Sequence, residues 1–234
     1  MRRRQLWLID LDNTLYDASW RVMGEINQRM TRYVAEKLSL PTEEASHLRA
    51  HYWKRYGATI LGLVRHHNIC PHDFLRATHP DEDLPLFVQP IRGERRRLAL
   101  LNGGRWLVTN APREYALHVL KLIGLDKMFE KILSIEDMYL CGRLRPKPSM
   151  MIWRHIARLS GRHPSALTLV DDSSENLRAA HRLGIRTARI LVSKTMRERS
   201  RYSGRPLVVR RPAYVKVQVH SLNCLARQQH KLYF

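Results

Sequence analysis

The chain has few Cys, Gly and Pro residues, and their scarcity excludes several structural classes. Its 234 residues include 3 Cys, an odd number with no C-x-x-C pair, which excludes a disulfide scaffold and a tetracysteine zinc site. Gly and Pro number 11 each, too few for a collagen-like or low-complexity chain. No apolar run approaches the roughly 18 residues that a membrane helix needs. Asp10 and Asp12 interrupt the apolar stretch that follows the basic start, so we expect no signal peptide. We expect a soluble, reduced protein of the cytoplasm with no membrane partner.

Acidic residues are also scarce relative to basic ones. Lys and Arg number 41 against 21 Asp and Glu, which gives a net charge of +20, and 32 of the 41 are Arg. Such a charge attracts polyanions: nucleic acid, anionic membranes or phosphorylated small molecules. The basic residues are spread from Arg2 to Lys231 with only short clusters. We therefore interpret the excess as a diffuse surface bias and expect no specific nucleic-acid partner.

Hydrophobic residues make up 44% of the chain, enough for a full core. Short apolar runs alternate with segments of helical spacing, which predicts a parallel sheet covered on both faces. One helical block interrupts this alternation after the first strand. The sequence therefore predicts an α/β fold, a doubly wound, Rossmann-like core formed by 1–16 and 89–234, with a helical cap inserted at 17–88. The predicted strands are 5–11, 105–109, 131–134, 166–170, 187–192 and 214–217. The predicted helices are 17–38, 42–56, 58–67, 71–76, 94–102, 113–123, 149–160, 173–183 and 219–228. Polar loops are expected at 79–85 and 194–212.

Polar side chains gather where the predicted strands end. The first strand ends in Asp10-Leu11-Asp12-Asn13-Thr14, the next in Thr109-Asn110, and the central strand in Asp171-Asp172. Lys147 stands between two prolines just before a helix. Ligands of open α/β sheets bind at the carboxyl ends of the strands. We therefore expect these side chains to converge on one edge of the sheet.

These residue types suit one another chemically. Clustered carboxylates repel, and a hard divalent ion such as Mg²⁺ resolves the repulsion while accepting oxygen ligands. One ionised carboxylate then serves as a nucleophile that forms an acyl phosphate, and a second transfers a proton to the leaving group. Thr, Asn and Lys side chains hold phosphoryl oxygens and neutralise their charge.

The four motifs, in this order, resemble the haloacid dehalogenase-like (HAD) phosphohydrolase superfamily. Its D-x-D-x-T motif is matched at 10–14, its Ser/Thr motif at Thr109, its Lys motif at Lys147 and its acidic motif at 171–172. The resemblance covers most of the chain. The dehalogenases of that superfamily lack the second Asp of the first motif, so Asp12 favours phosphate-ester chemistry over carbon–halogen cleavage.

The resemblance implies a role for each matching position. Asp10 is expected to be the nucleophile and Asp12 the general acid/base, with Lys147 bridging the nucleophile and the phosphate. Thr109 is expected to bind phosphate, helped by Asn110 and by the loop that contains Asn13. The implied cofactor is Mg²⁺, held by Asp10, the backbone carbonyl of Asp12, Asp171, and Asp172 as a ligand or a neighbouring acid.

A narrower resemblance concerns the expected cap. The stretches LIDLDNTLYD, YGATILGL at 56–63 and DDSSENL are similar to the pyrimidine 5′-nucleotidase branch of the superfamily, which hydrolyses nucleoside monophosphates such as UMP and CMP. This resemblance implies that Tyr56 and Thr59, with His51 or Tyr52, lie near the base or sugar. The same pattern also suits plain helix packing, in which Gly57 and Gly62 permit close approach.

We therefore expect a Mg²⁺-dependent phosphatase that acts on a small phosphorylated substrate through an aspartyl phosphate. The favoured substrate is a pyrimidine nucleoside 5′-monophosphate. Two alternatives share the same core: a phosphatase for another small ester, such as a sugar phosphate or phosphoglycolate, and a phosphoglucomutase. A third alternative, suggested by the net charge, is a nucleic-acid-binding protein on the same scaffold. The sequence leaves the oligomeric state open.

Overall fold

Six parallel strands form the sheet of the molecule, which we describe from a computed structural model over residues 5–19, 21–79, 82–88, 93–191 and 210–233. The strand order is β3-β2-β1-β6-β7-β8, and every neighbouring pair is parallel. The order reverses between β1 and β6, which is where doubly wound folds bind their ligands. The predicted fold class is confirmed. The strands are β1 Leu6–Ile9, β2 Gly104–Val108, β3 Lys131–Leu133, β6 Leu167–Asp171, β7 Arg186–Ile190 and β8 Val217–Val219.

Alternating side chains of β1 supply two hydrophobic cores, one on each face of the sheet. Trp7 and Ile9 pack with residues of α7 and α11, whereas Leu6 and Leu8 pack with residues of α8 and α9. All four side chains are buried, as expected for a strand covered on both faces. The helices are α6 Glu94–Ala99, α7 Arg113–Leu122, α8 Met150–Leu159, α9 Ser174–Arg182 and α11 Leu222–Gln228, and the 3₁₀ turns are η1 Ile135–Met138, η2 Pro164–Ala166 and η3 Gln229–Leu232.

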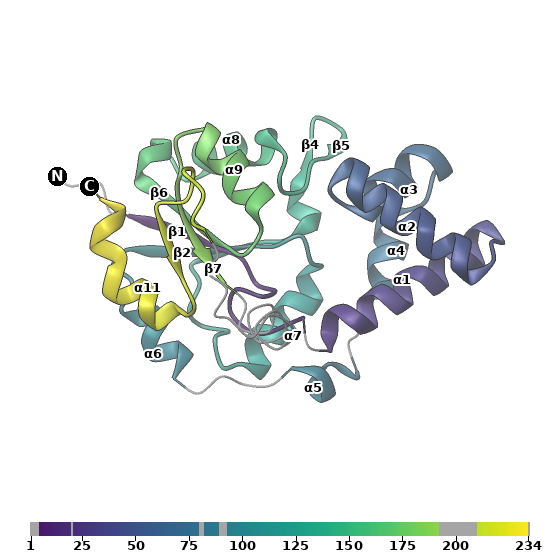
Figure 1. The fold of residues 1–234 in the computed structure, drawn as a ribbon, viewed down its shortest axis with the longest axis horizontal. Coiled ribbons are helices and arrows are strands. Elements are labelled where there is room, and N and C mark those ends of the chain that lie inside the picture. Colours follow the sequence, from purple (N-terminus) through teal and green to yellow (C-terminus); the bar gives the residue numbers. More distant parts are fainter. Residues whose placement is uncertain (1–4, 20, 80–81, 89–92, 192–209, 234) are drawn as a thin grey trace.

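Four helices between β1 and β2 form a separate group beyond the carboxyl edge of the sheet, shown in dark blue and purple in Figure 1. Helix α1 packs against α2 and α4, and α2 packs against α3. The first turn of α1 and the short helix α5 also belong to the core around the sheet, through Val22 and Leu84. The division of the chain into core and cap at 17 and 88 stays a prediction. The bounds are α1 Val22–Leu38, α2 Thr42–Tyr56, α3 Thr59–His67, α4 Pro71–Thr78 and α5 Leu84–Phe87.

The structure corrects several local expectations. Helix α5 occupies the end of a segment predicted to be a loop, and the last strand begins at Val217 rather than at Tyr214. A hairpin of β4 Tyr139–Leu140 and β5 Arg143–Leu144 was not predicted, because two-residue strands leave no periodic signal. The basic loop expected at 194–212 lies outside the described residues up to 209.

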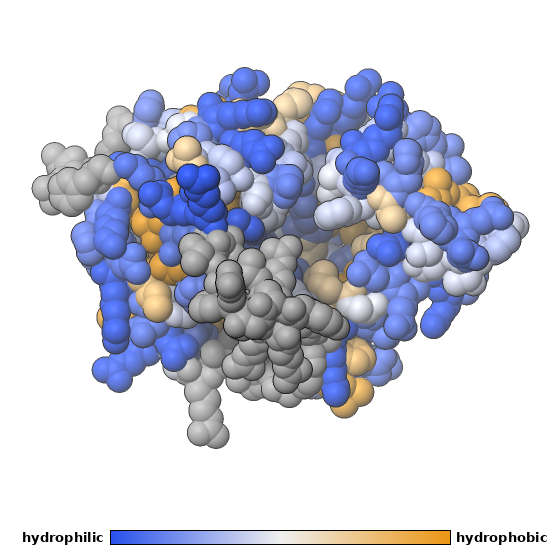
Figure 2. All heavy atoms as spheres, in the orientation of Figure 1, coloured by the Kyte–Doolittle hydropathy of each residue, from blue (hydrophilic) through white to orange (hydrophobic). Residues whose placement is uncertain are grey.

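Polar residues cover most of the face shown in Figure 2, consistent with the high content of charged residues. In the part of the chain that the structure describes, no helix combines the length and the apolar character needed to cross a bilayer.

Candidate active site

The first strand delivers Asp10 to the point where the strand order reverses. The backbone N–H of Asp10 donates to the carbonyl of Val170 on β6 at 3.0 Å, which extends the pairing of β1 and β6 by one residue. The chain then leaves the sheet, and Asn13 adopts the left-handed conformation with a φ of 61°. The Asp10 side chain is buried at this edge.

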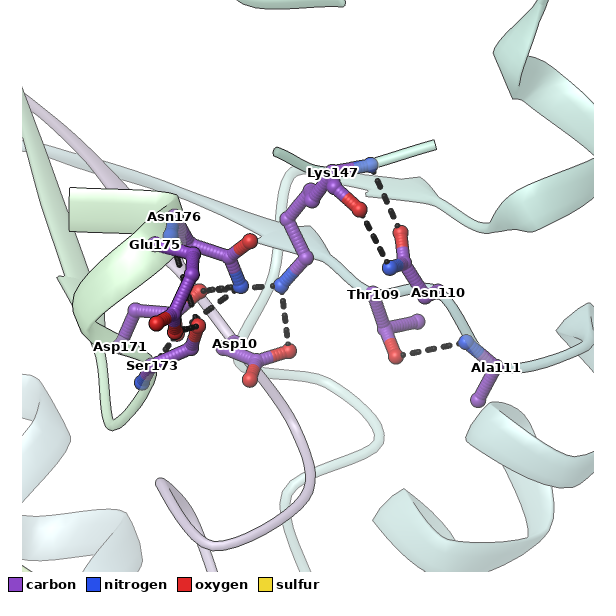
Figure 3. Close-up of polar contacts among 9 residues, drawn as sticks. All are labelled: Asp10, Thr109, Asn110, Ala111, Lys147, Asp171, Ser173, Glu175 and Asn176. Carbon is purple, nitrogen blue, oxygen red and sulfur yellow. Dashed lines mark hydrogen bonds and ion pairs between the residues drawn. The ribbon is translucent and has the colours of Figure 1, made fainter. Parts of the chain in front are cut away.

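A buried lysine joins two of the carboxylates. The Nζ atom of Lys147 lies 2.7 Å from Oδ1 of Asp10 and 3.1 Å from Oδ2 of Asp171 (Figure 3). The Lys147 side chain is only 2% exposed, so its charge is compensated by these two groups and not by water. The structure thus brings together three residues that are 137 and 24 positions apart along the chain.

Asn110 holds the main chain of Lys147 in place. Its amide Nδ2 donates to the Lys147 carbonyl at 2.9 Å, and its Oδ1 accepts from the Lys147 backbone N–H at 3.0 Å. Both ends of the amide are therefore used in orienting the lysine. The sequence suggested that Asn110 assists phosphate binding, and the structure gives it this different contact.

Asp171 ends β6 and is oriented by the start of α9. The Nδ2 atom of Asn176 lies 3.1 Å from Oδ1 and 3.0 Å from Oδ2 of Asp171, and the backbone N–H of Ser173 donates to Oδ1 at 2.8 Å. Ser173 also caps α9, because its side chain accepts from the backbone N–H of Asn176. A strand end and a helix start together fix this carboxylate.

The electrostatics of the cluster reflect burial and crowding. Burial raises the pKa of Asp10 well above its usual range; Asp171 and Asp172 add to the rise and Lys147 opposes it. Burial and the neighbouring Asp171 raise the pKa of Asp172 to about 7. Burial works to lower the pKa of Lys147, but Asp10 and Asp171 outweigh it and raise that pKa, so the lysine stays charged. The site holds more potential negative charge than one lysine compensates.

Asp10, Asp171 and Asp172 have the chemistry of a divalent cation site. One carboxylate oxygen from each lies within 4.8 Å of the others. Hard cations such as Mg²⁺ prefer oxygen ligands, and a cation here would favour the ionised forms that burial now opposes. Three of the four predicted metal ligands therefore fit such an ion through their side chains. The fourth, Asp12, was expected to contribute its backbone carbonyl, and its side chain has other partners.

The Asp12 carboxylate is held by two tyrosines. Its Oδ1 atom lies 2.5 Å from the hydroxyl of Tyr16 and 2.9 Å from the hydroxyl of Tyr115, and the two hydroxyls are 2.6 Å apart. Burial raises the pKa of Asp12, while hydrogen bonds from the two tyrosines and the charge of Lys147 oppose that rise. The net effect is an Asp12 pKa above its usual range, with burial as the largest cause.

Thr109 and Asn13, both predicted to bind substrate, lie in the loops that follow β2 and β1, and Figure 3 shows Thr109 on the same side of the sheet edge as Asp10 and Lys147. The Thr109 hydroxyl is buried and accepts from the backbone N–H of Ala111 at 3.0 Å (Figure 3), and among the described residues it donates to no acceptor. The Asn13 Oδ1 atom accepts from the backbone and hydroxyl of Ser19 at 2.9 and 2.8 Å. Among the described residues, the Thr109 hydroxyl is thus available to donate a hydrogen bond, whereas the Asn13 side chain is used within the loop after β1.

The other predicted substrate contacts, Tyr56 and Thr59, are engaged within the helical group. The Thr59 hydroxyl donates to the carbonyl of Arg49 at 3.2 Å, and the Tyr56 hydroxyl lies 2.7 Å from Nε2 of His66. Among the described residues, neither forms a hydrogen bond or ion pair with the carboxylate cluster. The turn between them packs close to the segment that contains Lys147: a Cβ on Gly57 would lie 3.3 Å from Cδ of Pro148.

The position of Gly62 agrees with the second interpretation of the 56–63 stretch, in which its glycines permit close packing of helices. A Cβ on this glycine would lie 2.2 Å from Cγ of Tyr52, so α2 and α3 approach too closely there for any side chain. Tyr52 is buried against α3 and lies 2.7 Å, through its hydroxyl, from Nε2 of His67. It is therefore part of the core of the helical group.

Sequence reasoning missed three residues of this site: Asn176, Tyr16 and Tyr115. Asn176 follows Asp171 by five residues in the first turn of the next helix, a spacing that could have indicated its contact. Tyr16 follows Asp12 by four residues within a loop. Tyr115 is 103 residues from Asp12, and nothing local in the sequence indicates their contact.

A family model described as a haloacid dehalogenase-like hydrolase matches residues 5–184. Phosphate metabolism protein 8 of Saccharomyces cerevisiae is 27% identical over 199 residues, which cover 78% of this chain and 60% of that protein. The chain thus spans about 60% of the length of this curated relative.

Solved structures show the same fold at low sequence identity. A HAD phosphatase from Thermococcus onnurineus superposes with a TM-score of 0.61 at 19% identity, over 97% of this chain and 98% of that one. The L-2-haloacid dehalogenase from Xanthobacter autotrophicus superposes with a TM-score of 0.56 at 16% identity, over 97% and 99%.

Proposed function

Because the chain belongs to the haloacid dehalogenase-like hydrolase family, we propose that it is a Mg²⁺-dependent phosphatase that uses Asp10 as its nucleophile. One observation carries the proposal: the ammonium group of Lys147 lies between Asp10 and Asp171 at the carboxyl edge of the sheet. A buried cation that contacts the nucleophile would also stabilise the negative charge of a phosphoryl group bound next to that nucleophile. The presence of Asp12 supports a phosphate ester as the substrate.

The first step transfers the phosphoryl group to the protein. A carboxylate oxygen of Asp10 attacks phosphorus, the P–O bond to the leaving alcohol breaks, and a proton from Asp12 moves to the leaving oxygen. The products are an aspartyl phosphate on Asp10, a free alcohol and an ionised Asp12. Lys147 and the hydroxyl of Thr109 would donate hydrogen bonds to the phosphoryl oxygens.

The second step returns the protein to its starting state. Asp12 takes a proton from a water molecule, the resulting hydroxide attacks phosphorus, and the bond to Asp10 breaks. Inorganic phosphate leaves, Asp10 is again a carboxylate and Asp12 again carries its proton. One molecule of water is consumed for each ester that is cleaved.

Asp10, Asp171 and Asp172 would hold the Mg²⁺ ion. When bound, the ion would neutralise charge on the carboxylates and on the phosphoryl oxygens. Two of these carboxylates are oriented by hydrogen bonds within the chain, Asp171 by Asn176 and Asp10 by Lys147.

For the substrate we propose a pyrimidine nucleoside 5′-monophosphate, with residues 17–88 acting as a cap over the site. Two points support this choice: the resemblance of the stretches at 8–17, 56–63 and 171–177 to the nucleotidase branch, and the contact of Gly57 with Pro148 beside Lys147. Because the hydroxyls of Tyr56 and Thr59 are engaged within the helical group, specificity would come from other residues of 17–88.

The proposal is tested by phosphate release from a panel of esters: UMP, CMP, dUMP, dTMP, AMP, GMP, phosphoglycolate and glucose phosphates, each with Mg²⁺ or EDTA. We expect Mg²⁺-dependent release that favours the pyrimidine monophosphates. Release from other esters alone would remove the nucleotidase assignment and keep the chemistry. A requirement for a bisphosphate activator, with little free phosphate, would indicate a mutase.

The Asp10→Asn variant is the matched control for this panel. We expect it to lose activity on every ester by at least about 10³-fold, because an amide oxygen is a poor nucleophile. Circular dichroism and thermal unfolding should show that the variant remains folded. Turnover at the parental rate would refute the role of Asp10.

A further inference from the structure

Two tyrosines from different parts of the chain meet at one oxygen of Asp12. Tyr16 lies in the loop after β1 and Tyr115 in the first turn of α7, and each is only 3% exposed. Both hydroxyls contact Oδ1 of Asp12, at 2.5 and 2.9 Å, and they contact each other at 2.6 Å. Three oxygens thus form a closed triangle of hydrogen bonds.

The number of protons in this triangle determines which oxygen of Asp12 accepts hydrogen bonds. Each tyrosine hydroxyl carries one proton. The two hydroxyls cannot both donate to each other, so within the triangle at least one of them donates to Oδ1. In a protonated carboxyl group the carbonyl oxygen is the better acceptor. The triangle therefore favours Oδ1 as the acceptor and leaves the acid proton on Oδ2.

The other oxygen of Asp12 is the one available for chemistry. Within the described segments, Oδ2 has no hydrogen-bond partner, whereas Oδ1 has two. The carboxyl group also lies close enough to Lys147 and Asp172 to interact with their charges, which places it beside the catalytic cluster. Oδ2 is thus the oxygen free to exchange a proton with a substrate there.

The tyrosines are themselves fixed by packing. The ring of His79, at the end of α4, meets the ring of Tyr115 edge-on, with centroids 5.2 Å apart and an interplanar angle of 71°. The Nδ1 atom of His79 lies 3.0 Å from the carbonyl of Leu75, which orients the imidazole. Tyr16 belongs to the hydrophobic core beside the sheet. The hydroxyls therefore hold the carboxyl group from rigid surroundings.

We propose that Tyr16 and Tyr115 are positioning residues that hold Asp12 by Oδ1, so that Oδ2 delivers the proton to the oxygen of the leaving alcohol. The inference rests on the proposed phosphatase function, because it assigns a task within that reaction. The inference also extends that function, since it names the oxygen of Asp12 that exchanges the proton and the two residues that select this oxygen.

The test removes the hydroxyls and varies the leaving group. Tyr16→Phe, Tyr115→Phe and the double variant keep the rings and lose the donors. Each is assayed with UMP, whose alkoxide must be protonated as it leaves, and with 4-nitrophenyl phosphate, whose leaving group needs no proton. Tyr33→Phe is the matched control, because this buried tyrosine packs against Phe74 in the helical group, away from the site.

We expect kcat/KM for UMP to fall by about 10- to 100-fold in the double variant, part of the value of a positioned general acid. We expect kcat/KM for 4-nitrophenyl phosphate to stay within about threefold, because that leaving group departs unaided. Inhibition by inorganic phosphate should be unchanged, since the tyrosines touch no phosphoryl oxygen. Tyr33→Phe should match the parent on both esters.

An equal loss on both esters, or no loss on UMP, would overturn the inference. If UMP is not cleaved by the parent, phosphoglycolate or another alkyl ester from the panel takes its place. A parent protein that cleaves no ester at all refutes the proposed function, and the inference with it, before any variant is compared. If the double variant does not fold, the single variants decide in the same way.

Discussion

At the scale of single residues, Lys147 determines the character of the site. It is almost fully buried and is the cation that contacts both Asp10 and Asp171. Burying a charge is costly unless it is paired, and a pair that loses one partner leaves the other uncompensated. The lysine is therefore both part of the proposed chemistry and a structural requirement of this edge.

Lys147→Met should lower the free energy of unfolding by about 3 kcal/mol near pH 8 without divalent cations, because it leaves several carboxylates buried together. The pKa of Asp10 is raised and that of Asp172 is about 7, so both take up protons as the pH falls. The loss should therefore shrink toward pH 5. Urea unfolding at both pH values with EDTA measures it.

Lys121→Met, at an exposed position on α7, is the control and should change stability by less than about 0.5 kcal/mol. A loss in Lys147→Met that grew as the pH fell would contradict this account of the charges.

The sequence predicted which residues meet at the site better than it predicted their partners. Asp10, Lys147 and Asp171 were expected at one edge because strand ends share an edge, and they lie there. The contacts of Asn110 and Tyr115 depend on distances between loops and helices that no local pattern encodes. Side chains such as Thr59 were assigned by resemblance, and the packing of the helical group determined their hydrogen bonds instead.

At the scale of elements, the periodicity of the sequence predicts most helices and strands, and the elements that it misses are short. Strands β1, β2 and β6 and the long helices lie near their predicted positions, because buried apolar runs and helical spacing are strong signals. The last strand, for example, was expected from Tyr214 and begins at Val217. Element ends depend on single contacts, and for this reason they were predicted less well.

The approach of α2 and α3 at Gly62 gives a test at this scale. Gly62→Ala should destabilise the protein by about 1–3 kcal/mol, because its Cβ would overlap the ring of Tyr52. Gly24→Ala on α1 has nothing within 4 Å of the new Cβ and should be neutral or stabilising by up to about 1 kcal/mol. Thermal unfolding of both variants measures the contrast. Equal effects would show that the helices do not pack as described.

At the scale of the whole molecule, the topology and the charge serve the same site. The reversal of strand order between β1 and β6 brings distant motifs to one edge, opposite the helices α1–α4 (Figure 1). A net charge of +20 attracts small anions to the surface, and added salt screens this attraction. The doubly wound core was predictable because both signals, alternation and strand-end chemistry, extend along the chain.

The most direct test of the account is to trap the phosphoryl group on Asp10. In Asp12→Asn the second step lacks its base, while 4-nitrophenyl phosphate still enters the first step, because its leaving group needs no proton. After an acid quench and proteolysis, mass spectrometry should find one phosphoryl group on Asp10. The Asp10→Asn/Asp12→Asn double variant should carry none. A phosphoryl group on another residue, or no covalent adduct while the parent enzyme turns over, would contradict the account.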